Sequence, residues 1–333
     1  MSCISEQQVW EAPTMKRFFT LFLVTVWVAA WASVAQSASN SRAMSQLPSR
    51  QQTCQLYKNP SRELEPVSNQ ALNGSNILFK AVTNDNVLSL PAAPLPTLHP
   101  ASLKARVPVM MYHDILPGKK VLYDLTPQEL RKHFELIKSS KMTPISLDRL
   151  IAHLRTGSPL PEKPILLTFD DGYGGHYQYA YPLLKEYGYP AAFSIHTSWV
   201  GVNTGRTHLS WQQLKTMAND SLVTIASHTK THPALTKLSD QKLTQEIVES
   251  KKILESELER PIHYFTYPYG NYNSRVKKAV VKANYLAAIA FEAPTEGFAN
   301  QSEDLFSIAR FEKSRLEKII PQVWGNSTLP QCN

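Results

Sequence analysis

The fold is decided by residues 164–173, which read Pro-Ile-Leu-Leu-Thr-Phe-Asp-Asp-Gly-Tyr. A continuous apolar run bounded by turn-forming residues is typical of a strand that is covered on both faces. In α/β barrels, chemistry gathers where such strands end, so Asp170 and Asp171 are expected at the mouth of a site. Because neighbouring strand residues point to opposite sides, one acid is expected to hold a metal and the other to handle a proton. A strand followed by an ordinary Asp-Gly turn is the alternative.

Strand-like and helix-like segments alternate on both sides of this stretch. Further strands are expected at 107–114, 191–195, 222–226, 263–267 and 286–291. Helices are expected to begin at Thr126, Ser146 and Trp211, to end near Tyr187 after a Tyr-rich segment, and to cover 239–258 and 274–284. This alternation predicts βαβ units and a mainly parallel sheet or barrel, which places the chain in the α/β class.

Two of these helices carry specific sequence signals. Thr126 precedes Pro127 and Glu129, which is the order of an N-cap, a first-turn proline and a capping-box acid. The helix over 239–258 has an expected buried stripe of Ile247, Ile253, Leu254 and Leu258.

Composition and charge exclude several classes of protein. The 333 residues are 43% hydrophobic and 19% charged, so the bulk of the chain is neither disordered nor embedded in a membrane. The net charge of +8 favours anionic surroundings such as a bacterial surface or an acidic polymer. The basic residues form no dense block and no recognition motif, so no nucleic-acid partner is expected.

The N-terminus carries a targeting signal. Lys16 and Arg17 precede an uncharged apolar run over 18–34, which ends in small residues before a cleavage position after Ala35. This order is typical of a secretory signal peptide, so residues 1–35 are expected to be removed, with Met15 as an alternative start. The chain is then exported and is periplasmic, cell-envelope or secreted. An uncleaved anchor is the alternative, and membrane contact is expected only in that case.

The remaining chain divides at its changes in composition. Residues 36–103 form a low-complexity extension rich in Ser, Asn, Gln and Pro, with a short strand at 77–82 and an extended linker at 91–96. A compact domain is expected over 104–325, followed by a tail at 326–333. Cleavage would leave Cys54 and Cys332, which are expected to form a disulfide; two free thiols are the alternative.

Two further motifs follow strand patterns. His228 and His232 come directly after the strand at 222–226, and histidines four apart fall on one side of a helical turn. With Asp171 they offer two imidazole nitrogens and a carboxylate, a donor set that suits a divalent metal with one position left for water. Residues 265–270 read Phe-Thr-Tyr-Pro-Tyr-Gly, whose backbone amides can face an oxyanion, although a simple strand-closing turn has the same sequence.

The order of these motifs resembles the polysaccharide deacetylases of carbohydrate esterase family 4. The matching segments are Thr-Phe-Asp-Asp-Gly-Tyr at 168–173, His-Thr-Lys-Thr-His at 228–232 and Tyr-Pro-Tyr-Gly at 267–270. The resemblance implies a distorted (β/α) barrel with fewer than eight strands and a divalent metal, zinc in most members. It also implies hydrolysis of N-acetyl groups on the N-acetylglucosamine units of a polysaccharide.

The resemblance assigns roles to individual residues. Asp170 corresponds to the catalytic base, and Asp171, His228 and His232 correspond to the metal ligands. The backbone amide of Tyr269 would help to hold the oxyanion.

Two departures from the family pattern narrow the resemblance. Thr266 stands where many members have an arginine, and no histidine follows His263 to provide the acid of a late Leu-His motif. The early segment 107–114 and the arginine-free third motif resemble the branch that deacetylates the biofilm polymer poly-β-1,6-N-acetylglucosamine. In that branch the acid comes from the early Tyr-His segment, here His113. Arg310 is expected to supply the missing cation, and a surface arginine is the alternative.

Other functions remain open. A deacetylase of peptidoglycan or chitin oligomers would use the same residues. A secreted glycan-binding protein without turnover is the alternative of another class, but it would have no need of a base or an acid.

Overall fold

The computed structural model describes residues 96–291 and 296–325 of the chain, all within the unit Phe79–Gln331 of the two into which the chain divides. The leader, most of the extension, the strand at 77–82, Cys54, Cys332 and the tail lie outside the described residues. Their assignments, and the boundaries expected at residues 35, 103 and 325, stay predictions.

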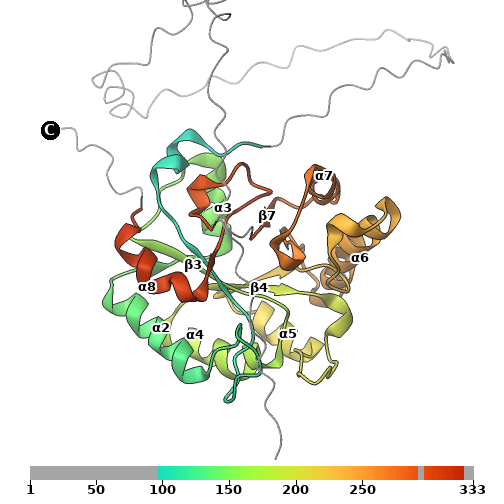
Figure 1. Ribbon diagram of the computed structural model, residues 1–333, viewed down its shortest axis with the longest axis horizontal. Helices are drawn as coiled ribbons and strands as arrows, with labels where there is room; N and C mark the ends of the chain where they lie inside the picture. Colours follow the sequence, from blue (N-terminus) through green and yellow to red (C-terminus); the bar gives the residue numbers. More distant parts are fainter. Residues whose placement is uncertain (1–95, 292–295, 326–333) are drawn as a thin grey trace, which may run out of the picture. The chain divides into compact units, whose positions relative to one another are not determined.

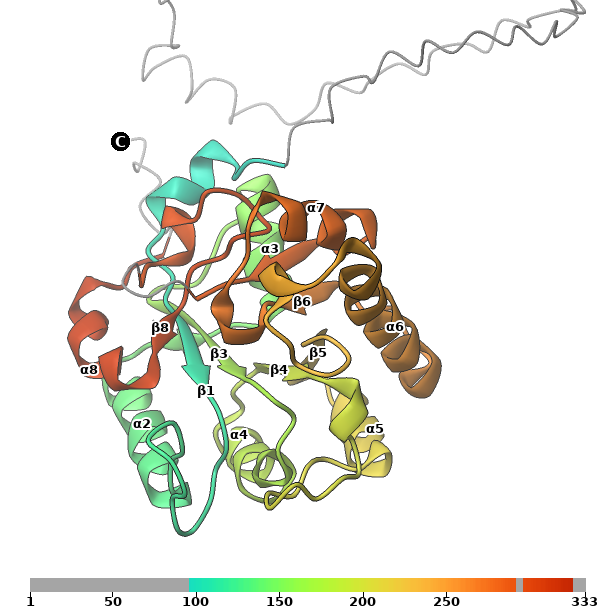
Figure 2. The same ribbon diagram turned by 45° about the vertical axis from the view of Figure 1, so that its right-hand side comes forward.

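A parallel sheet forms the centre of the fold (Figures 1 and 2). Its strands lie in the spatial order β7-β6-β5-β4-β3-β1-β8, and the short β2 pairs with the start of β3. The bounds are β1 (Val109–Tyr112), β2 (Thr143–Pro144), β3 (Pro164–Phe169), β4 (Ala191–Ile195), β5 (Val223–Ser227), β6 (Tyr264–Thr266), β7 (Ala287–Ile289) and β8 (Phe311–Glu312). Every residue of β1, β3 and β4 is buried, which is the physical reason for their unbroken apolar runs.

Helices surround this sheet (Figure 1), and they alternate with the strands as the sequence predicts. They are α2 (Pro127–Ser139), α3 (Leu147–Thr156), α4 (Tyr181–Tyr187), α5 (Trp211–Ala218), α6 (Asp240–Leu258), α7 (Ser274–Lys282) and α8 (Leu316–Ile319). The N-cap of α2 is the expected one: Thr126 and Glu129 form a capping box behind Pro127. A π-helix at His176–Ala180 precedes α4 in the Tyr-rich segment.

The long helix α6 differs from its expected stripe. Ile247, Leu254 and Leu258 are buried, but Ile253 is only partly buried, whereas Leu243 and Ser250 are buried. The true stripe follows 243, 247, 250, 254 and 258, which keeps the spacing of three and four residues that one face of a helix requires.

The late segment 305–312 brings the two edges of the sheet together. Ile308 pairs in parallel with Ile289 of β7, and three residues later Phe311 in β8 pairs with Met110 of β1. The Ile308 N–H donates to the carbonyl of Ala288 at 3.0 Å, and the Ala290 N–H donates to the carbonyl of Ile308 at 2.8 Å. One irregular segment thus replaces a full strand, which confirms the distorted barrel.

Within the described ranges, no helix combines the length and the apolar character that a membrane crossing requires.

Candidate active site

The strand register places the expected site residues at one end of the barrel. Tyr112 of β1 pairs with Phe169 of β3, so His113 and Asp170 each follow directly after the end of a strand. The Asp170 N–H donates to the carbonyl of Tyr112 at 2.9 Å, which fixes the two strand ends to each other. His228 is held in the same way after β5, where its N–H donates to the carbonyl of Ile195 at 2.8 Å.

Asp171, His228 and His232 converge on one point. The Oδ1 atom of Asp171 lies 3.5 Å from His228 Nε2 and 3.4 Å from His232 Nε2, and the two Nε2 atoms are 3.1 Å apart. These three ligand atoms all lie within 4.8 Å of one another. The three residues that the sequence names as metal ligands therefore form a single cluster.

The backbone brings these ligands together in a different way from the one the sequence suggests. The prediction that His228 and His232 lie on a helical turn is wrong, because residues 228–232 form a loop in which Thr229 and His232 have φ values of 71° and 59°. Likewise β3 ends at Phe169, and Asp171 has a φ of 77°. The two acids are therefore separated by a turn rather than by the alternation of a strand.

A hydrogen bond sets the tautomer of His228. Its Nδ1 donates to the carbonyl oxygen of Thr266 at 2.8 Å, so Nε2 carries the free lone pair that faces the cluster. Thr266 is itself held by a hydrogen bond of 2.8 Å between its Oγ1 and the hydroxyl of Ser194. The backbone carbonyl of Thr266 therefore orients the ring of His228 within the cluster.

The charges of the cluster suit a cation. Burial lowers the pKa of His228 to about 3 and also lowers that of His232, so both imidazoles are neutral near pH 7. Burial raises the pKa of Asp171 to about 6, because removal from water destabilises the charged form of the carboxylate. A divalent ion would stabilise the charged form of this carboxylate. Two nitrogens with one carboxylate oxygen are also a donor set typical of catalytic zinc. The residues present fit such an ion.

Asp170 is buried beside the cluster and is paired with Arg310. The Nη1 atom of Arg310 lies 2.7 Å from Asp170 Oδ2, and both residues are 2% exposed. Burial alone would raise the pKa of Asp170, but the guanidinium of Arg310, with smaller contributions from His228 and His113, holds it well below its usual range. Arg310 therefore is not a surface residue, and the cation absent at Thr266 reaches Asp170 from the closing segment of the barrel.

The second oxygen of Asp170 is free. Its Oδ1 is buried and has no hydrogen-bond partner in the described part of the chain. An ionised carboxylate with one oxygen fixed by a cation and the other unpaired is arranged to accept a proton from a molecule that enters the site.

His113 follows β1 at the same end of the barrel as the two carboxylates. It is half-buried, and a positive charge on its ring lowers the pKa of both Asp170 and Asp171, which places it near both. Its carbonyl accepts a hydrogen bond from His176 Nε2 at 3.1 Å, and its ring contacts that of Tyr123 with centroids 5.5 Å apart.

Tyr269 follows β6 in a strained turn. Its φ is 59°, and the next residue, Gly270, has a φ of 71°. A Cβ at Gly270 would lie only 2.0 Å from the carbonyl oxygen of Phe291, so glycine is required there. The backbone N–H of Tyr269 has no acceptor within the described residues, and its ring lies against that of His232 with centroids 4.8 Å apart. The turn that carries Tyr269 thus lies beside the ligand cluster.

Nothing in the sequence indicates which residue fixes the loop 228–232, which carries the two clustered histidines. Glu246 of α6 accepts hydrogen bonds from the backbone of Lys230 at 3.0 Å and of Thr231 at 2.8 Å, and from the Thr231 hydroxyl at 2.6 Å. An acid on the polar side of an amphipathic helix is expected to face solvent. Only the tertiary arrangement shows that this one fixes the loop between the two ligands.

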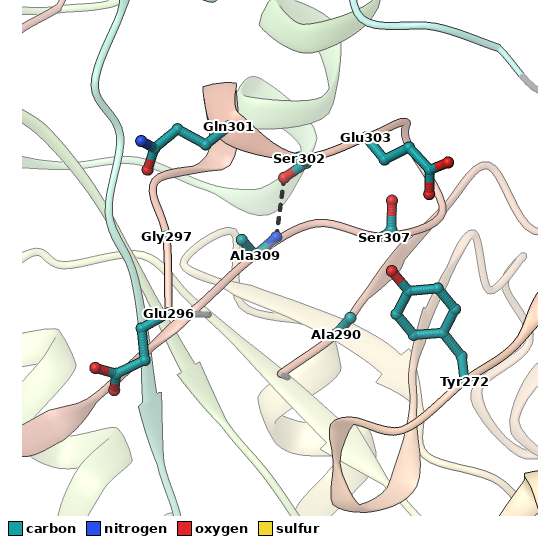
Figure 3. A pocket seen from close by; sticks show the side chains of 9 residues that line it. All are labelled: Tyr272, Ala290, Glu296, Gly297, Gln301, Ser302, Glu303, Ser307 and Ala309. Carbon is teal, nitrogen blue, oxygen red and sulfur yellow. Dashed lines mark hydrogen bonds between the residues drawn. The ribbon is translucent and has the colours of Figure 1, made fainter. Parts of the chain in front are cut away.

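A cavity of about 310 Å³ lies elsewhere in the molecule (Figure 3). It is lined by Tyr272, Ala290, Glu296, Gly297, Gln301, Ser302, Glu303, Ser307 and Ala309. None of these is a predicted site residue. Its acids are already paired, Glu296 with Arg315 at 2.5 Å and Glu303 with Lys277 at 2.8 Å, so the cavity offers no free charge of the kind found at the strand ends.

The chain is similar to several known sequences. The family described as polysaccharide deacetylase matches residues 157–288. The chain is 30% identical over 211 residues to YxkH of Bacillus subtilis (strain 168), a protein provisionally named a polysaccharide deacetylase, and the match covers 63% of this chain and 72% of that protein. It is 26% identical over 220 residues to the poly-beta-1,6-N-acetyl-D-glucosamine N-deacetylase of Escherichia coli (strain K12), covering 54% of this chain but only 32% of that protein.

Solved structures share the fold. The deacetylase PplD of Streptococcus pyogenes, solved with acetate, has a TM-score of 0.59 at 24% identity and covers 66% of this chain and 97% of its own. IcaB from Ammonifex degensii has a TM-score of 0.58 at 21% identity and covers 65% of this chain and 96% of its own.

Proposed function

Because this chain belongs to the polysaccharide deacetylase family, whose members are hydrolases, we propose that it removes N-acetyl groups from N-acetylglucosamine units of an extracellular or cell-envelope polysaccharide. The products are acetate and a glucosamine unit. The observation that carries the proposal is the buried, unpartnered Oδ1 of Asp170, held as an ionised acceptor beside three metal-ligating side chains.

Asp171, His228 and His232 would hold a divalent ion, which we take to be Zn²⁺. When bound, such an ion polarises a carbonyl oxygen and makes a neighbouring water more acidic. The protein residues supply the rest of the chemistry. The fixed tautomer of His228 and the low pKa of both histidines keep the two lone pairs available at neutral pH.

The reaction needs one proton taken and one returned. Asp170 accepts the proton of the attacking water through Oδ1, while Arg310 holds Oδ2 and keeps the carboxylate ionised. The free N–H of Tyr269 donates to the carbonyl oxygen as negative charge develops on it. His113 protonates the amine nitrogen as the carbon–nitrogen bond breaks, because an amide nitrogen leaves poorly as an anion.

We favour poly-β-1,6-N-acetylglucosamine as the polymer. The support is the similarity to proteins named for that activity, including one from Staphylococcus epidermidis that is 28% identical over 192 residues, covering 54% of this chain and 66% of that protein. The expected signal peptide, which lies outside the described residues, favours action in the periplasm, on the cell envelope or outside the cell.

Metal analysis joined to an acetate-release assay tests the proposal. Protein purified without chelators should contain about one divalent ion per chain and release acetate fastest from the β-1,6 polymer. Faster acetate release from chitin oligomers or peptidoglycan would show that one of these, and not the β-1,6 polymer, is the preferred substrate. Glycan binding with no acetate release from any polymer would instead make the chain a non-catalytic glycan-binding protein.

A further inference from the structure

We propose that the tip of the loop between β1 and α2, residues 121–123, forms a binding subsite for the sugar unit next to the one that is deacetylated. This inference rests on the proposed function and extends it, because it makes the enzyme one that recognises a chain of sugars rather than a single unit. Figure 2 shows the loop continuing past the end of β1 before the chain turns back into α2.

The tip exposes apolar side chains to an unusual degree for a folded loop. Val121, Leu122 and Tyr123 are 48%, 87% and 55% exposed, and they are consecutive. A leucine exposed to this extent adds nothing to the core, and three exposed apolar residues in a row mark a contact surface.

The tip is nevertheless held in one conformation by buried polar groups at its base. Asp124 is 1% exposed and forms a two-bond ion pair with Arg206, at 2.7 and 2.9 Å. Its Oδ2 also accepts the backbone N–H groups of Lys120 at 2.8 Å and Val121 at 3.0 Å. Charged hydrogen bonds of this kind fix the backbone without using the tip side chains.

Two further contacts tie the loop to neighbouring segments. Lys313, which is 8% exposed, donates from Nζ to the carbonyl oxygen of Leu122 at 3.3 Å. At the base, the Leu116 N–H donates to the Leu125 carbonyl at 2.9 Å, and the Leu125 N–H donates to the Asp114 carbonyl at 3.1 Å. The backbone of the apolar tip is thus held in one conformation. Ligand binding therefore costs little conformational entropy for ordering the loop.

Tyr123 joins the tip to His113, the proposed general acid. The Tyr123 ring contacts the ring of His113, which we place at the departing nitrogen of the sugar. A sugar unit bonded to the reacting one therefore emerges beside Tyr123 and Leu122. Pyranose rings have an apolar face of C–H groups, and an exposed tyrosine beside an aliphatic side chain offers a matching surface with a hydroxyl for the ring's polar edge.

Kinetics on substrates of two lengths test this subsite. The full chain and its Tyr123→Ala, Tyr123→Phe and Leu122→Ala variants would be assayed for acetate release from a β-1,6-linked N-acetylglucosamine pentasaccharide and from a small aryl acetate. Leu103→Ala is the matched control, because Leu103 is an exposed leucine (52%) in the 3-10 helix Pro100–Lys104, which precedes β1 at the opposite end of that strand from the loop.

We expect Tyr123→Ala and Leu122→Ala to raise KM for the pentasaccharide about tenfold, the effect of losing one well-buried apolar contact, with kcat little changed. Tyr123→Phe, which loses only the hydroxyl, should raise KM less than Tyr123→Ala, and Leu103→Ala should retain wild-type KM. No comparable rise in KM is expected for the aryl acetate, which has no neighbouring sugar unit.

Three results would overturn the proposal. Unchanged KM in Tyr123→Ala and Leu122→Ala, with an active wild type, would remove the subsite and leave the proposed function intact. A loss of kcat on the pentasaccharide with KM unchanged would show that the tip only supports His113. A wild type that releases no acetate from any glycan would refute the proposed function and the subsite together.

Discussion

The two adjacent acids of the Asp-Asp-Gly turn have different surroundings, and these surroundings divide their tasks. Asp171 lies among the histidines and has a raised pKa, whereas Asp170 is paired with a cation and has a lowered one. The surroundings of Asp171 suit a metal ligand. Those of Asp170 suit a base that remains ionised.

Substitutions should separate these tasks. Asp171→Asn and His228→Ala should lower the metal content of the purified protein. Asp170→Asn should keep the metal and lose on the order of 10²–10⁴ in kcat, because only the proton acceptor is removed. Elemental analysis and acetate release measure the two effects, and full metal occupancy in His228→Ala would contradict the ligand assignment.

Arg310 should act through Asp170. In Arg310→Gln, burial is no longer opposed by a nearby cation, so the pKa of Asp170 should rise and its ionised form should be lost at a higher pH than in the wild type. The acidic limb of the pH profile of kcat should therefore move to higher pH, and Arg310→Lys should restore part of the shift. The same limb and the same kcat in Arg310→Gln would leave Arg310 with a structural role alone.

The loss of turnover caused by removing His113 should be larger for substrates with a poorer leaving group. His113→Ala should fold and retain metal while losing on the order of 10²–10⁴ in kcat on the polymer. An aryl acetate, whose leaving group departs without a proton, should recover much of the loss. Near-normal turnover of the polymer would assign the acid to another residue.

At the scale of elements, helix α6 holds the loop of the proposed metal site without supplying one of its proposed ligands. Glu246 fixes the backbone between His228 and His232, where two residues have positive φ and the loop has no regular structure of its own. Glu249, one turn along the same helix, only forms an exposed ion pair with Lys230. The two acids therefore provide a matched comparison.

Glu246→Ala should weaken metal affinity by about 10- to 100-fold, the usual effect of removing a group that supports a ligand. Glu249→Ala should leave affinity unchanged, because exposed ion pairs contribute little. Titration of the metal-free proteins with Zn²⁺ measures both affinities, and equal values in the two variants would show that the loop does not depend on α6.

At the scale of the whole molecule, the three proposed metal ligands come from segments that are far apart in the chain. Asp171 follows β3, and both histidines follow β5, with β4 lying between these strands in the sheet. An ion that binds all three side chains binds only the folded barrel, so it must stabilise the fold.

Removal of the metal should therefore lower Tm. At a free ion concentration of 100 times Kd the stabilisation is about 2.7 kcal/mol. A domain of this size loses roughly 2–4 °C per kcal/mol, so a chelator should lower Tm by several degrees and added Zn²⁺ should restore it. His228→Ala is the control and should show little response. An equal response in that variant would place the stabilising ion elsewhere.

The sequence by itself predicted the elements and the three side chains that the structure brings into one cluster. The apolar run at 164–169 and the cap at Thr126 are local signals, because burial and capping depend on residues close in the chain. The ligands could be named because each motif follows a strand, and parallel strands end at the same side of a sheet.

The tertiary structure alone decided how these residues are arranged and which distant partners complete them. The helical turn expected for the histidines is a loop, since Glu246 and the carbonyl of Thr266 hold it from other elements. Arg310 was named from the sequence only as a candidate, and its pairing with Asp170, 140 residues away, depends on how the closing segment joins β7 to β1. The physical reason is that local sequence patterns specify which side chains of a segment are buried. Strand register and barrel closure specify which distant residues those side chains contact.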